Sequence, residues 1–483
     1  MRYSIAGATR TRAAYLTASP SRKLPGTSRR IGMWVRGDGT GAWLRVAVQD
    51  ASGAKSILNL SQRVKWRGWR FVSTALPTGL AQPLEFVRVY AVETKQSRRY
   101  SGTLAFDDLT SWSERTAPVA VTAPLRDPLV ADLAPLGDGG LRVAVISDAG
   151  IRAAAPGSSR VARTRRMMRE IVAAKPGLVL INGDLVGKGE AADLAFARSL
   201  IQEELAGKVP WQYVPGDREV GQSGDLTNFR AEFGSPVRTL DQDGTRFVLL
   251  NSARGTFRLG GFAQLLRLRS ELRTASDDSS VKSVVVVAHH PTSDPNAGGT
   301  AELTDPREGE LVESMLAEFR SDTGKNAAYV GSHARRFGVT RHDNVPLVVA
   351  GPVDDLARAG TGSFSGWTML RVDAAADAWL RAEFRPMVDA LQINAPATLP
   401  VGSVAGVSAA VTQAGRLRPV SYPMGALWVS SQTLHIGPAG GAPSSAVAAY
   451  NPETGKLTGI RAGQTTLVLQ VNGKTASRAL TVT

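Results

Sequence analysis

The chain has 483 residues, too many for one ordinary domain, and this length suggests two to four domains. Its 43% hydrophobic and 20% charged residues are normal for globular proteins, so the chain is not expected to be mainly disordered. Cysteine is absent, which excludes disulfides, thiolate nucleophiles and cysteine-bound zinc. With only five histidines, any metal site must depend largely on carboxylates.

The formal net charge of +15 is unevenly distributed along the chain. Residues 1–120 hold 19 Lys and Arg against 7 Asp and Glu, and residues 391–483 hold 6 against 1. The segment between them is close to neutral. Basic flanks suit an anionic polymer, such as nucleic acid or a phosphate-bearing wall glycan, although a merely solvated surface would explain them too.

The N-terminus carries arginines but no apolar core of the kind that a signal peptide needs. The chain is therefore either cytoplasmic or part of a longer precursor, and we favour a secreted or cell-surface protein cut from such a precursor. No apolar run is long enough to span a membrane. We expect residues 1–24 to form an N-terminal segment ahead of the first domain.

Residues 25–113 have the pattern of an all-β domain, because short apolar stretches alternate with turn signals and no helical period intervenes. A two-sheet jelly roll is the natural architecture. Four tryptophans in this segment are candidates either for the core or for stacking on sugar rings; they are Trp34, Trp43, Trp66 and Trp69. The segment, and its stretch 104–109 above all, resembles the carbohydrate-binding, galactose-binding-like jelly rolls. That resemblance implies that Asp107 or Asp108 could hold a structural Ca²⁺, with ordinary surface carboxylates as the alternative.

Three further segments follow. Residues 114–140 are rich in Pro, Ala and Asp and read as a linker. Residues 141–388 alternate buried strands with helical patterns, such as a helix over 160–174, and predict a layered α/β domain. Residues 391–483 return to β, and their Gly-rich turn, Thr-rich strand and Trp428-x-Ser-Ser resemble bacterial immunoglobulin-like domains, with a generic β-sandwich as the alternative.

Acidic or imidazole side chains follow five of the strands predicted in the central segment, where open α/β sheets bind their ligands. They are Asp148, Asp184, Asp217 with Glu219, His289 with His290, and His333. One aspartate in such a place could simply cap a helix. The repetition at successive strand ends is what indicates a site.

In this order, Asp148, Gly183-Asp184, Gly216–Glu219, His289-His290-Pro291 and Gly331-Ser332-His333 resemble the calcineurin-like metallophosphoesterases. The family pattern is Asp-x-His, Gly-Asp, Gly-Asn-His-Asp/Glu, His-x-Pro and Gly-His-x-His, and it covers roughly half of the chain. The resemblance implies a four-layer α/β sandwich in which two divalent metals polarise a phosphoryl group and activate a water between them.

The resemblance also implies roles for individual residues. Metal ligands would be Asp148, Asp184, Asp217 and His289, with Asp184 bridging both metals. The carboxylate-rich set favours Mn²⁺ or Mg²⁺, one or two ions, with Fe or Zn as alternatives. Catalytic roles fall to Asp217, to His333 and to Arg218, which stands where the family has histidine. Arg218 could hold a phosphate bidentately but cannot donate a proton.

The sequence departs from the family pattern in ways that weaken one metal position. Gly150 stands for the histidine of the first motif, and Ser332 and Ala334 stand for both histidines of the last. His333 lies between them and could substitute after a one-residue shift. The first metal position therefore keeps two carboxylates, while the second keeps Asp184, Asp217 and His289.

We accordingly expect a multidomain protein, a central metallophosphoesterase sandwich flanked by a jelly roll and an immunoglobulin-like domain. The expected activity is a phosphoric ester hydrolase acting on a phosphomonoester or phosphodiester of a surface glycan or nucleotide. The alternative is a weak or inactive phosphoesterase fold that binds a glycan or the cell envelope. Expected partners are the phosphoester and a polysaccharide or anionic wall polymer; nucleic acid is less favoured, because no recognised motif accompanies the basic module. The domain order resembles the C-terminal part of secreted bacterial phosphodiester glycosidase-type proteins.

Overall fold

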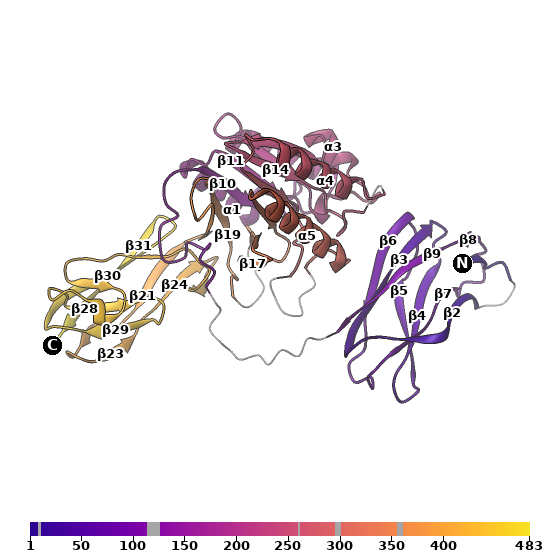
Figure 1. Ribbon diagram of the computed structural model, residues 1–483, viewed down its shortest axis with the longest axis horizontal. Helices are drawn as coiled ribbons and strands as arrows, with labels where there is room; N and C mark the ends of the chain where they lie inside the picture. Colours follow the sequence, from indigo (N-terminus) through magenta and orange to yellow (C-terminus); the bar gives the residue numbers. More distant parts are fainter. Residues whose placement is uncertain (8–10, 114–125, 259–260, 295–300, 355–360) are drawn as a thin grey trace. The chain divides into compact units, whose positions relative to one another are not determined.

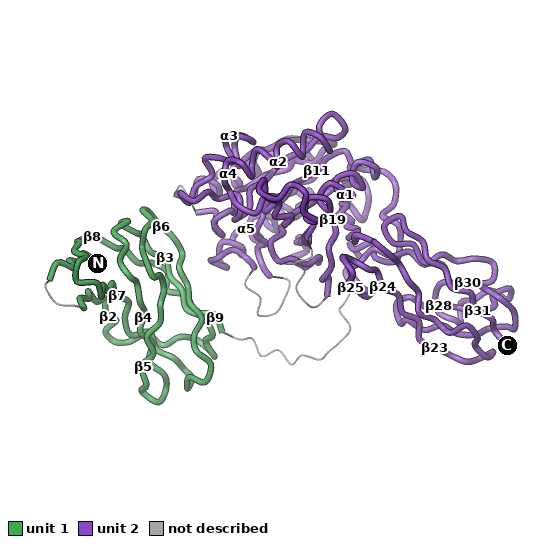
Figure 2. Tube along the Cα trace, turned by 180° about the vertical axis from the view of Figure 1, so that it is seen from behind, with its two compact units in different colours: residues 1–122 green, residues 123–483 purple. Residues whose placement is uncertain are grey.

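The computed structural model describes residues 1–7, 11–113, 126–258, 261–294, 301–354 and 361–483 (Figure 1). Their contacts divide the chain into two compact units, residues 1–122 and residues 123–483, coloured green and purple in Figure 2. Most of the predicted linker's first half, 114–125, lies outside the described residues. In the described part of the chain, no helix has the length and apolar character that crossing a lipid bilayer requires.

The first unit consists of two antiparallel sheets around an apolar core. One sheet has the strand order β2-β7-β4-β5 and the other β6-β3-β9, with β1 paired to β8. The strands are β1 Arg2–Ser4, β2 Arg12–Lys23, β3 Ser28–Asp38, β4 Trp43–Gln49, β5 Lys55–Ser61, β6 Arg67–Ala75, β7 Glu85–Glu93, β8 Ser101–Thr103 and β9 Ala105–Ser113. In β4, Leu44 and Val46 are buried in the core, so Trp43 and Arg45 point to the opposite face of the sheet.

The segment expected to precede this domain supplies two of its strands. β2 pairs with β7 in the larger sheet, from Arg12 opposite Glu93 to Thr17 opposite Arg88. Its sequence does not alternate clearly, because Tyr15, Leu16 and Thr17 are all exposed, and a strand without alternation gives little periodic signal.

The tryptophans and carboxylates singled out in this unit fall into different environments. Trp34 is buried and Trp69 is 42% exposed, while Trp43 and Trp66 are half-buried. The side chain of Asp107 accepts a hydrogen bond from the backbone N–H of Asp108 (2.9 Å). Among residues 1–7 and 11–113, no three Asp, Glu or His side chains converge, so the expected structural Ca²⁺ has no such cluster there.

The central segment confirms the predicted alternation of strands and helices. One sheet has the order β12-β11-β10-β19-β20 and the other β13-β14-β15-β16-β18-β17. The strands are β10 Leu141–Ile146, β11 Leu178–Asn182, β12 Trp211–Val214, β13 Arg238–Gln242, β14 Thr245–Leu249, β15 Ser283–Val287, β16 Asn326–Gly331, β17 Gly338–His342, β18 Val345–Val349, β19 Gly366–Val372 and β20 Leu380–Pro386. The helices are α1 Ser159–Ala173, α2 Ala191–Glu204, α3 Thr227–Phe233, α4 Ala263–Asp277 and α5 Pro306–Thr323, with a 3₁₀ turn η1 at Asp217–Glu219.

These two sheets pack face to face, and helices cover their outer faces (Figure 1). The inner faces share one core that includes Val143, Leu180, Val285 and Val330. On the outer face of the first sheet, Ile181 packs with residues of α1 and α2. On the outer face of the second sheet, Val286 packs with residues of α4 and α5. The central domain is therefore four-layered, with the carboxyl ends of its parallel strands left free for a site.

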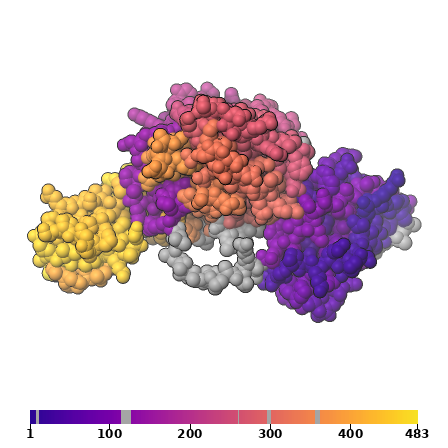
Figure 3. Space-filling view, in the orientation of Figure 1, coloured from indigo at the N-terminus to yellow at the C-terminus, as the bar shows by residue number. Residues whose placement is uncertain are grey.

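The C-terminal residues form three small sheets that share a core with the central domain. Their strands are β21 Ala390–Asn394, β22 Thr398–Leu399, β23 Val404–Gly406, β24 Ser408–Gln413, β25 Arg416–Pro419, β26 Leu427–Trp428, β27 Leu434–Ile436, β28 Ala448–Asn451, β29 Lys456–Gly459, β30 Gly463–Val471 and β31 Lys474–Val482. Phe384 of β20 bridges to Met424, and both belong to the same buried cluster as Trp428. In the space-filling view, the yellow C-terminal atoms lie directly against the central domain (Figure 3).

The described second half of the predicted linker is also packed. Leu129 and Val130 belong to the shared core, and the Ala131 N–H donates to the carbonyl oxygen of Ala382 in β20 (2.8 Å). The N–H of Ala426 donates to the carbonyl oxygen of Asp132 (2.8 Å). This stretch therefore joins β20 to the C-terminal strands and does not behave as a free spacer.

Because the core is continuous, we predict that the central and C-terminal strands lose structure together. Phe384 is fully buried, so Phe384→Ala should lower the free energy of unfolding of residues 123–483 by about 3–5 kcal/mol. Hydrogen exchange across a urea series would measure this: peptides from β19 and from β30 should lose protection at the same, lowered midpoint. Leu417→Ala, which removes an exposed side chain, should leave the midpoint in place. Separate midpoints for the two peptides, with only one of them shifted, would contradict a shared core.

Candidate metal centre

Four side chains meet at the carboxyl ends of strands from both sheets. They are Asp148 after β10, Asp184 after β11, His289 after β15 and His333 after β16, and their ligand atoms all lie within 4.8 Å of one another. A second group, with the same separation limit, contains Asp217, His290 and His333. Parallel strands deliver their ends to one edge of a sheet, so residues far apart in sequence are brought together here.

His333 and Asp217 form the exposed side of this cluster, whereas His289 and His290 are buried. The Nε2 atom of His289 lies 3.1 Å from Nδ1 of His333 and 3.5 Å from carboxylate oxygens of Asp184 and Asp217. Nδ1 of His333 is 3.2 Å from the Asp217 carboxylate. His290 is buried, stacks against the His333 ring at 4.3 Å between centroids, and has Nδ1 3.2 Å from the Ser252 hydroxyl.

Unusual backbone conformations aim these side chains. Asp148, Asp184 and His333 all have positive φ, at 55°, 55° and 60°. Such conformations cost an ordinary residue about 1–3 kcal/mol and are often retained at functional sites. Gly183 is also required, because a Cβ there would lie 2.3 Å from the His289 ring.

Hydrogen bonds set the orientation of His289. Its Nδ1–H donates to the backbone carbonyl oxygen of Asn182 (2.8 Å), which leaves Nε2 facing the carboxylates. The Asn182 side chain in turn donates to the Ser332 hydroxyl (2.9 Å) and to the carbonyl oxygen of Ala288 (3.0 Å). A metal ligand held in this way has a fixed tautomer and a fixed direction.

Glu219 ties the loops of the site together. Its fully buried carboxylate accepts hydrogen bonds from the N–H groups of Gly216 (2.6 Å), Asp184 (2.8 Å) and Val186 (3.3 Å) and from the hydroxyl of Tyr213 (2.7 Å). These bonds join the loop after β11 to the loop after β12. Glu219 therefore positions Asp184 but is not itself a candidate metal ligand.

The site concentrates negative charge. Burial, together with the neighbouring carboxylates, raises the pKa of Asp184, and burial raises the pKa of Glu219. Burial alone would lower the pKa of the His289 imidazole, but the Asp184 carboxylate and the hydrogen bond with Asp217 outweigh it and raise that pKa to about 10. For Asp217, burial opposes ionisation, yet His289 and His333 hold its pKa below the usual range. The carboxylates and imidazoles of this cluster are therefore close enough to change one another's protonation.

Two arginines supply positive charge beside the aspartates. Arg218 has its Nε 3.2 Å from Oδ2 of Asp184, and its backbone N–H donates to Oδ1 of the same carboxylate (3.0 Å). Arg160 lies at Gly150: a Cβ on Gly150 would be 3.5 Å from the Arg160 Nη1, which donates to the Gly150 carbonyl oxygen (3.1 Å). The space beside Gly150, where the family pattern has an imidazole, thus adjoins a guanidinium.

Asp354 anchors this second arginine. Its carboxylate pairs with Arg160 and with Arg163, each at 2.6 Å, and it is buried in the loop after β18. Its N–H lies 3.4 Å from the carbonyl oxygen of Asp148. The loop of the first motif is therefore stabilised by an arginine–carboxylate cluster, and Gly150, with φ of 61°, would accept a side chain only with strain.

The structure brings all of the predicted site residues into this one edge. Asp148, Asp184 and His289 are buried, whereas Asp217 and His333 border solvent and Arg218 contacts Asp184. Their individual roles stay predictions. Asn182 and Asp354 were not expected, while Glu219 was noted in the third motif but was given no role.

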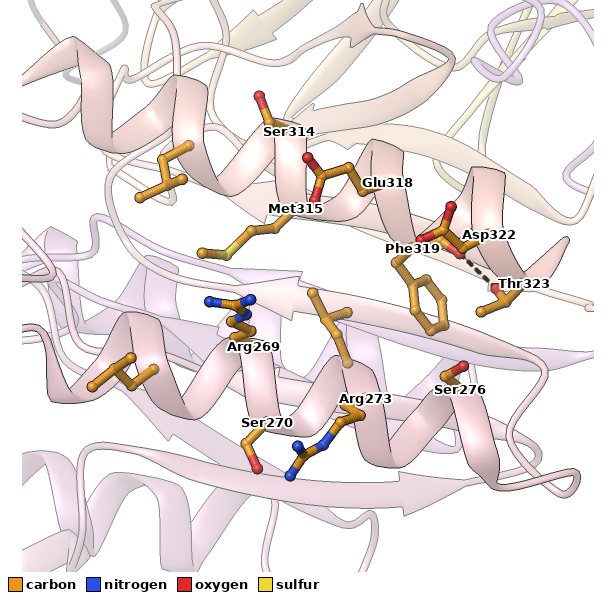
Figure 4. Close-up of a pocket in the computed structure, with 13 residues that line it drawn as sticks. Arg269, Ser270, Arg273, Ser276, Ser314, Met315, Glu318, Phe319, Asp322 and Thr323 are labelled. Atoms are coloured by element: carbon orange, nitrogen blue, oxygen red, sulfur yellow. Dashed lines mark hydrogen bonds between the residues drawn. The ribbon is translucent and has the colours of Figure 1, made fainter.

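A groove on the central domain lies away from these residues. It measures about 770 Å³ and runs between α4 and α5, and Figure 4 shows Arg269 and Arg273 of α4 on one wall with Glu318 and Asp322 of α5 on the other. None of the predicted ligands lines it. Of the predicted site residues, Arg218 lines a smaller cavity of about 390 Å³, which is formed by the loops 187–190 and 220–222.

The donor set suits a divalent metal. Carboxylate oxygens and an imidazole nitrogen lie close enough to share one ion, and hard, oxygen-rich sites prefer Mn²⁺ or Mg²⁺ to thiophilic metals. The first family position is less well provided, because its remaining ligands are Asp148 and the shared Asp184 while Arg160 adds positive charge nearby. The residues present therefore fit one ion better than two.

We predict that Glu219→Gln will disturb the site, although Glu219 is not one of the proposed metal ligands. Replacing one carboxylate oxygen by an amide group puts a donor against N–H and O–H donors, which should lower the free energy of unfolding by about 1–3 kcal/mol. Loss of positioning should also weaken Mn²⁺ binding by about 10–100-fold. Urea denaturation and calorimetric Mn²⁺ titration would measure the two effects. Glu190→Gln, a nearby but solvent-bordering change, is the matched control; equal behaviour of the two variants would refute the positioning role.

Comparisons with known proteins found one family model and several similar solved structures. Residues 141–331 match the family model of the calcineurin-like phosphoesterases. No curated protein matches the chain by sequence. Similar solved structures include a purple acid phosphatase from yellow lupin (Lupinus luteus) seeds, 17% identical, with a TM-score of 0.42 and coverage of 77% of this chain and 72% of that one. A dimetal phosphatase from Danio rerio is 14% identical, with a TM-score of 0.34 and coverage of 48% and 93%. The family match covers less than half of the chain and indicates a calcineurin-like metallophosphoesterase domain at residues 141–331.

Proposed function

We propose that the central domain hydrolyses a phosphomonoester or phosphodiester with a divalent cation held by Asp148, Asp184, Asp217 and His289. The observation that carries this proposal is the convergence of buried carboxylates and a fixed imidazole at strand ends within 4.8 Å. Mn²⁺ or Mg²⁺ is the proposed ion, with Fe or Zn as alternatives. When bound, such a cation supplies Lewis-acid polarisation of the phosphoryl group.

Arg218 is proposed to bind the phosphate. Its side chain is 32% exposed while its partner Asp184 is buried, so the guanidinium lies at the border between the ligand cluster and solvent. A guanidinium has five donors and can hold two phosphate oxygens at once. Since it now bonds to Asp184, an ion on Asp184 would free it to turn toward the substrate.

His333 and Asp217 are proposed to handle the proton. His333 is the most exposed of the three imidazoles in the cluster, and its Nδ1 faces the Asp217 carboxylate at 3.2 Å. A His–carboxylate pair of this kind can pass a proton to a departing alkoxide, which Arg218 cannot do. The cavity beside Arg218, with its glycine-rich walls, offers room for the leaving group.

The alternative function is that of a binding protein on a weak or inactive phosphoesterase fold. Its supporting observation is that both oxygens of Asp184 already accept from Arg218 (Nε and backbone N–H), so an internal cation competes for the bridging ligand. In that case the flanking β modules would carry the function by attaching the protein to a glycan or the envelope.

We further propose a secreted or cell-surface setting, with a polysaccharide or anionic wall polymer as the partner and the phosphoester on a surface glycan or nucleotide. The charge distribution supports an anionic partner, because the first 120 residues hold 19 basic against 7 acidic side chains. The resemblance of the β modules to carbohydrate-binding and bacterial immunoglobulin-like domains supports the setting. Nucleic acid is the less favoured partner.

The hydrolytic proposal predicts that Asp184→Asn lowers activity. With added Mn²⁺, hydrolysis of an aryl phosphodiester or an aryl phosphomonoester should fall by about 100-fold or more, because the amide removes a charged ligand. Asp343→Asn, at an exposed carboxylate near His342, is the matched control and should retain the full rate. An unchanged rate for Asp184→Asn would overturn the mechanism.

The geometry also predicts the amount of metal. The protein purified with Mn²⁺ should hold about one ion per chain, since Arg160 and Gly150 leave the first position with two carboxylates. Elemental analysis and electron paramagnetic resonance would measure the number, a spin-coupled pair being distinct from a single ion. Two tightly held ions would contradict the one-ion site. A metal-free, inactive protein would favour the binding alternative instead.

A further inference from the structure

One face of the four-stranded sheet in the first unit collects aromatic and cationic side chains. The strand register places Tyr15 of β2 opposite Tyr90 of β7, Tyr90 opposite Arg45 of β4, and Arg45 opposite Asn59 of β5. Side chains two residues apart in a strand share a face, so Trp43 and Arg88 lie on it as well. We call these six residues the Tyr15 face; they are Tyr15, Trp43, Arg45, Asn59, Arg88 and Tyr90.

Contacts within the Tyr15 face organise it as a platform. The rings of Tyr15 and Tyr90 are 5.0 Å apart between centroids, and the Arg88 guanidinium lies 4.6 Å from the centre of the Tyr15 ring. The Arg45 guanidinium lies 4.7 Å from the Trp43 ring, and the Trp43 indole N–H donates to Oδ1 of Asn59 (3.0 Å). Cation–π contacts thus hold both guanidinium groups beside aromatic rings.

The positive charge of this face is not neutralised within the described part of the unit. Arg45 and Arg88 each have a buried Nε without a hydrogen-bond acceptor, and neither forms an ion pair with a described carboxylate. Arg98, in the same unit, is different: it pairs with Glu93 at 2.8 Å. Because these Nε atoms are buried, only the terminal Nη groups of Arg45 and Arg88 could meet a ligand from the solvent side.

Burial in the core does not account for the Tyr15 face. The core-facing residues of β4 are Leu44, Val46 and Val48, on the opposite side of the strand. Tyr15 is 53% exposed and Ile57, beside the face on β5, is 45% exposed. Ala47 stands between Arg88 and Ile57 in the register, so a small side chain separates the larger ones.

We propose that the Tyr15 face binds an anionic polysaccharide. A pyranose ring would lie on the exposed face of Tyr15, and the carboxylate or phosphate groups of the polymer would pair with the terminal Nη groups of Arg45 and Arg88. Asn59 and the half-buried Trp43 edge would meet sugar hydroxyls. This gives the partner proposed above a site, and it does not depend on hydrolysis at the metal centre.

A nucleic acid fits this face less well. Single-stranded nucleic acids stack successive bases on several open aromatic rings. Here Tyr90 is only 5% exposed, and guanidinium groups cover one side of Tyr15 and of Trp43. One open ring beside two unpaired cations matches a charged sugar better than a row of bases.

The test is binding by the full-length chain in EDTA, so that the metal site takes no part. The probes are polygalacturonate, which carries carboxylates, phosphomannan, which carries phosphates, neutral dextran, and a single-stranded oligothymidylate. Affinity electrophoresis at fixed ionic strength should show binding to one or both acidic glycans, with dextran weaker by about tenfold or more. The arm that binds identifies the anionic group.

Variants assign the binding to the Tyr15 face. Arg45→Gln with Arg88→Gln should weaken binding by about tenfold or more, and Tyr15→Ala by about threefold. Arg63→Gln with Arg99→Gln removes the same charge from exposed loop positions and should change binding by about twofold at most. Thermal unfolding of each variant excludes misfolding, and Tyr15→Ala gives a second readout without a change of charge.

Three results would overturn the proposal. They are no binding to either acidic glycan, an equal loss from the loop pair Arg63 and Arg99, and tighter binding of the oligothymidylate through Arg45 and Arg88. Because aryl phosphate hydrolysis is measured separately with Mn²⁺, failure of the Tyr15 face and failure of the metal centre are distinguishable.

Discussion

Like charges held close together at the edge of two sheets set the conditions for the rest of the central domain. Asp148, Asp184 and Asp217 approach one another and the buried Glu219 at strand ends, where little solvent screens them. The fold keeps them there with positive φ angles, with glycines that permit close approach and with the four hydrogen bonds accepted by Glu219. The positive φ angles cost stability, whereas the hydrogen bonds of Glu219 stabilise the loops that carry the aspartates.

Positively charged side chains lie on both sides of these carboxylates and offset part of their negative charge. Arg218 bonds to Asp184, and the pair Arg160 and Asp354 stands beside the first motif. The same substitutions that remove family histidines thus bring arginines near the site. The result is a centre in which side chains and an ion share the neutralisation, and the balance between them decides how much metal the protein holds.

The main elements and the site's location could be predicted from the sequence because their signals are local. Val284–Val287 is a continuous apolar run, and ligand-type residues follow strand after strand, so His289 and Asp184 could be found without a structure. Asp354 could not, since its role depends on Arg160 almost two hundred residues away in sequence. β2 was missed because its exposed residues do not alternate, and the helix α4 was missed because exposed Leu266 blurs its apolar stripe. The sequence does not reveal which guanidinium pairs with which carboxylate, or which strands are neighbours in a sheet.

The continuous core between β20 and the C-terminal strands limits how far these two parts can move relative to each other. β20 pairs with β19, and β19 pairs with β10, the strand that leads into Asp148. If the C-terminal strands attach the protein to a surface, they hold the central domain rigidly, because Phe384 and Met424 pack in the core that both parts share. The open side of the site would then keep a fixed orientation relative to that surface. Only substrates on the side that the site faces could then enter it.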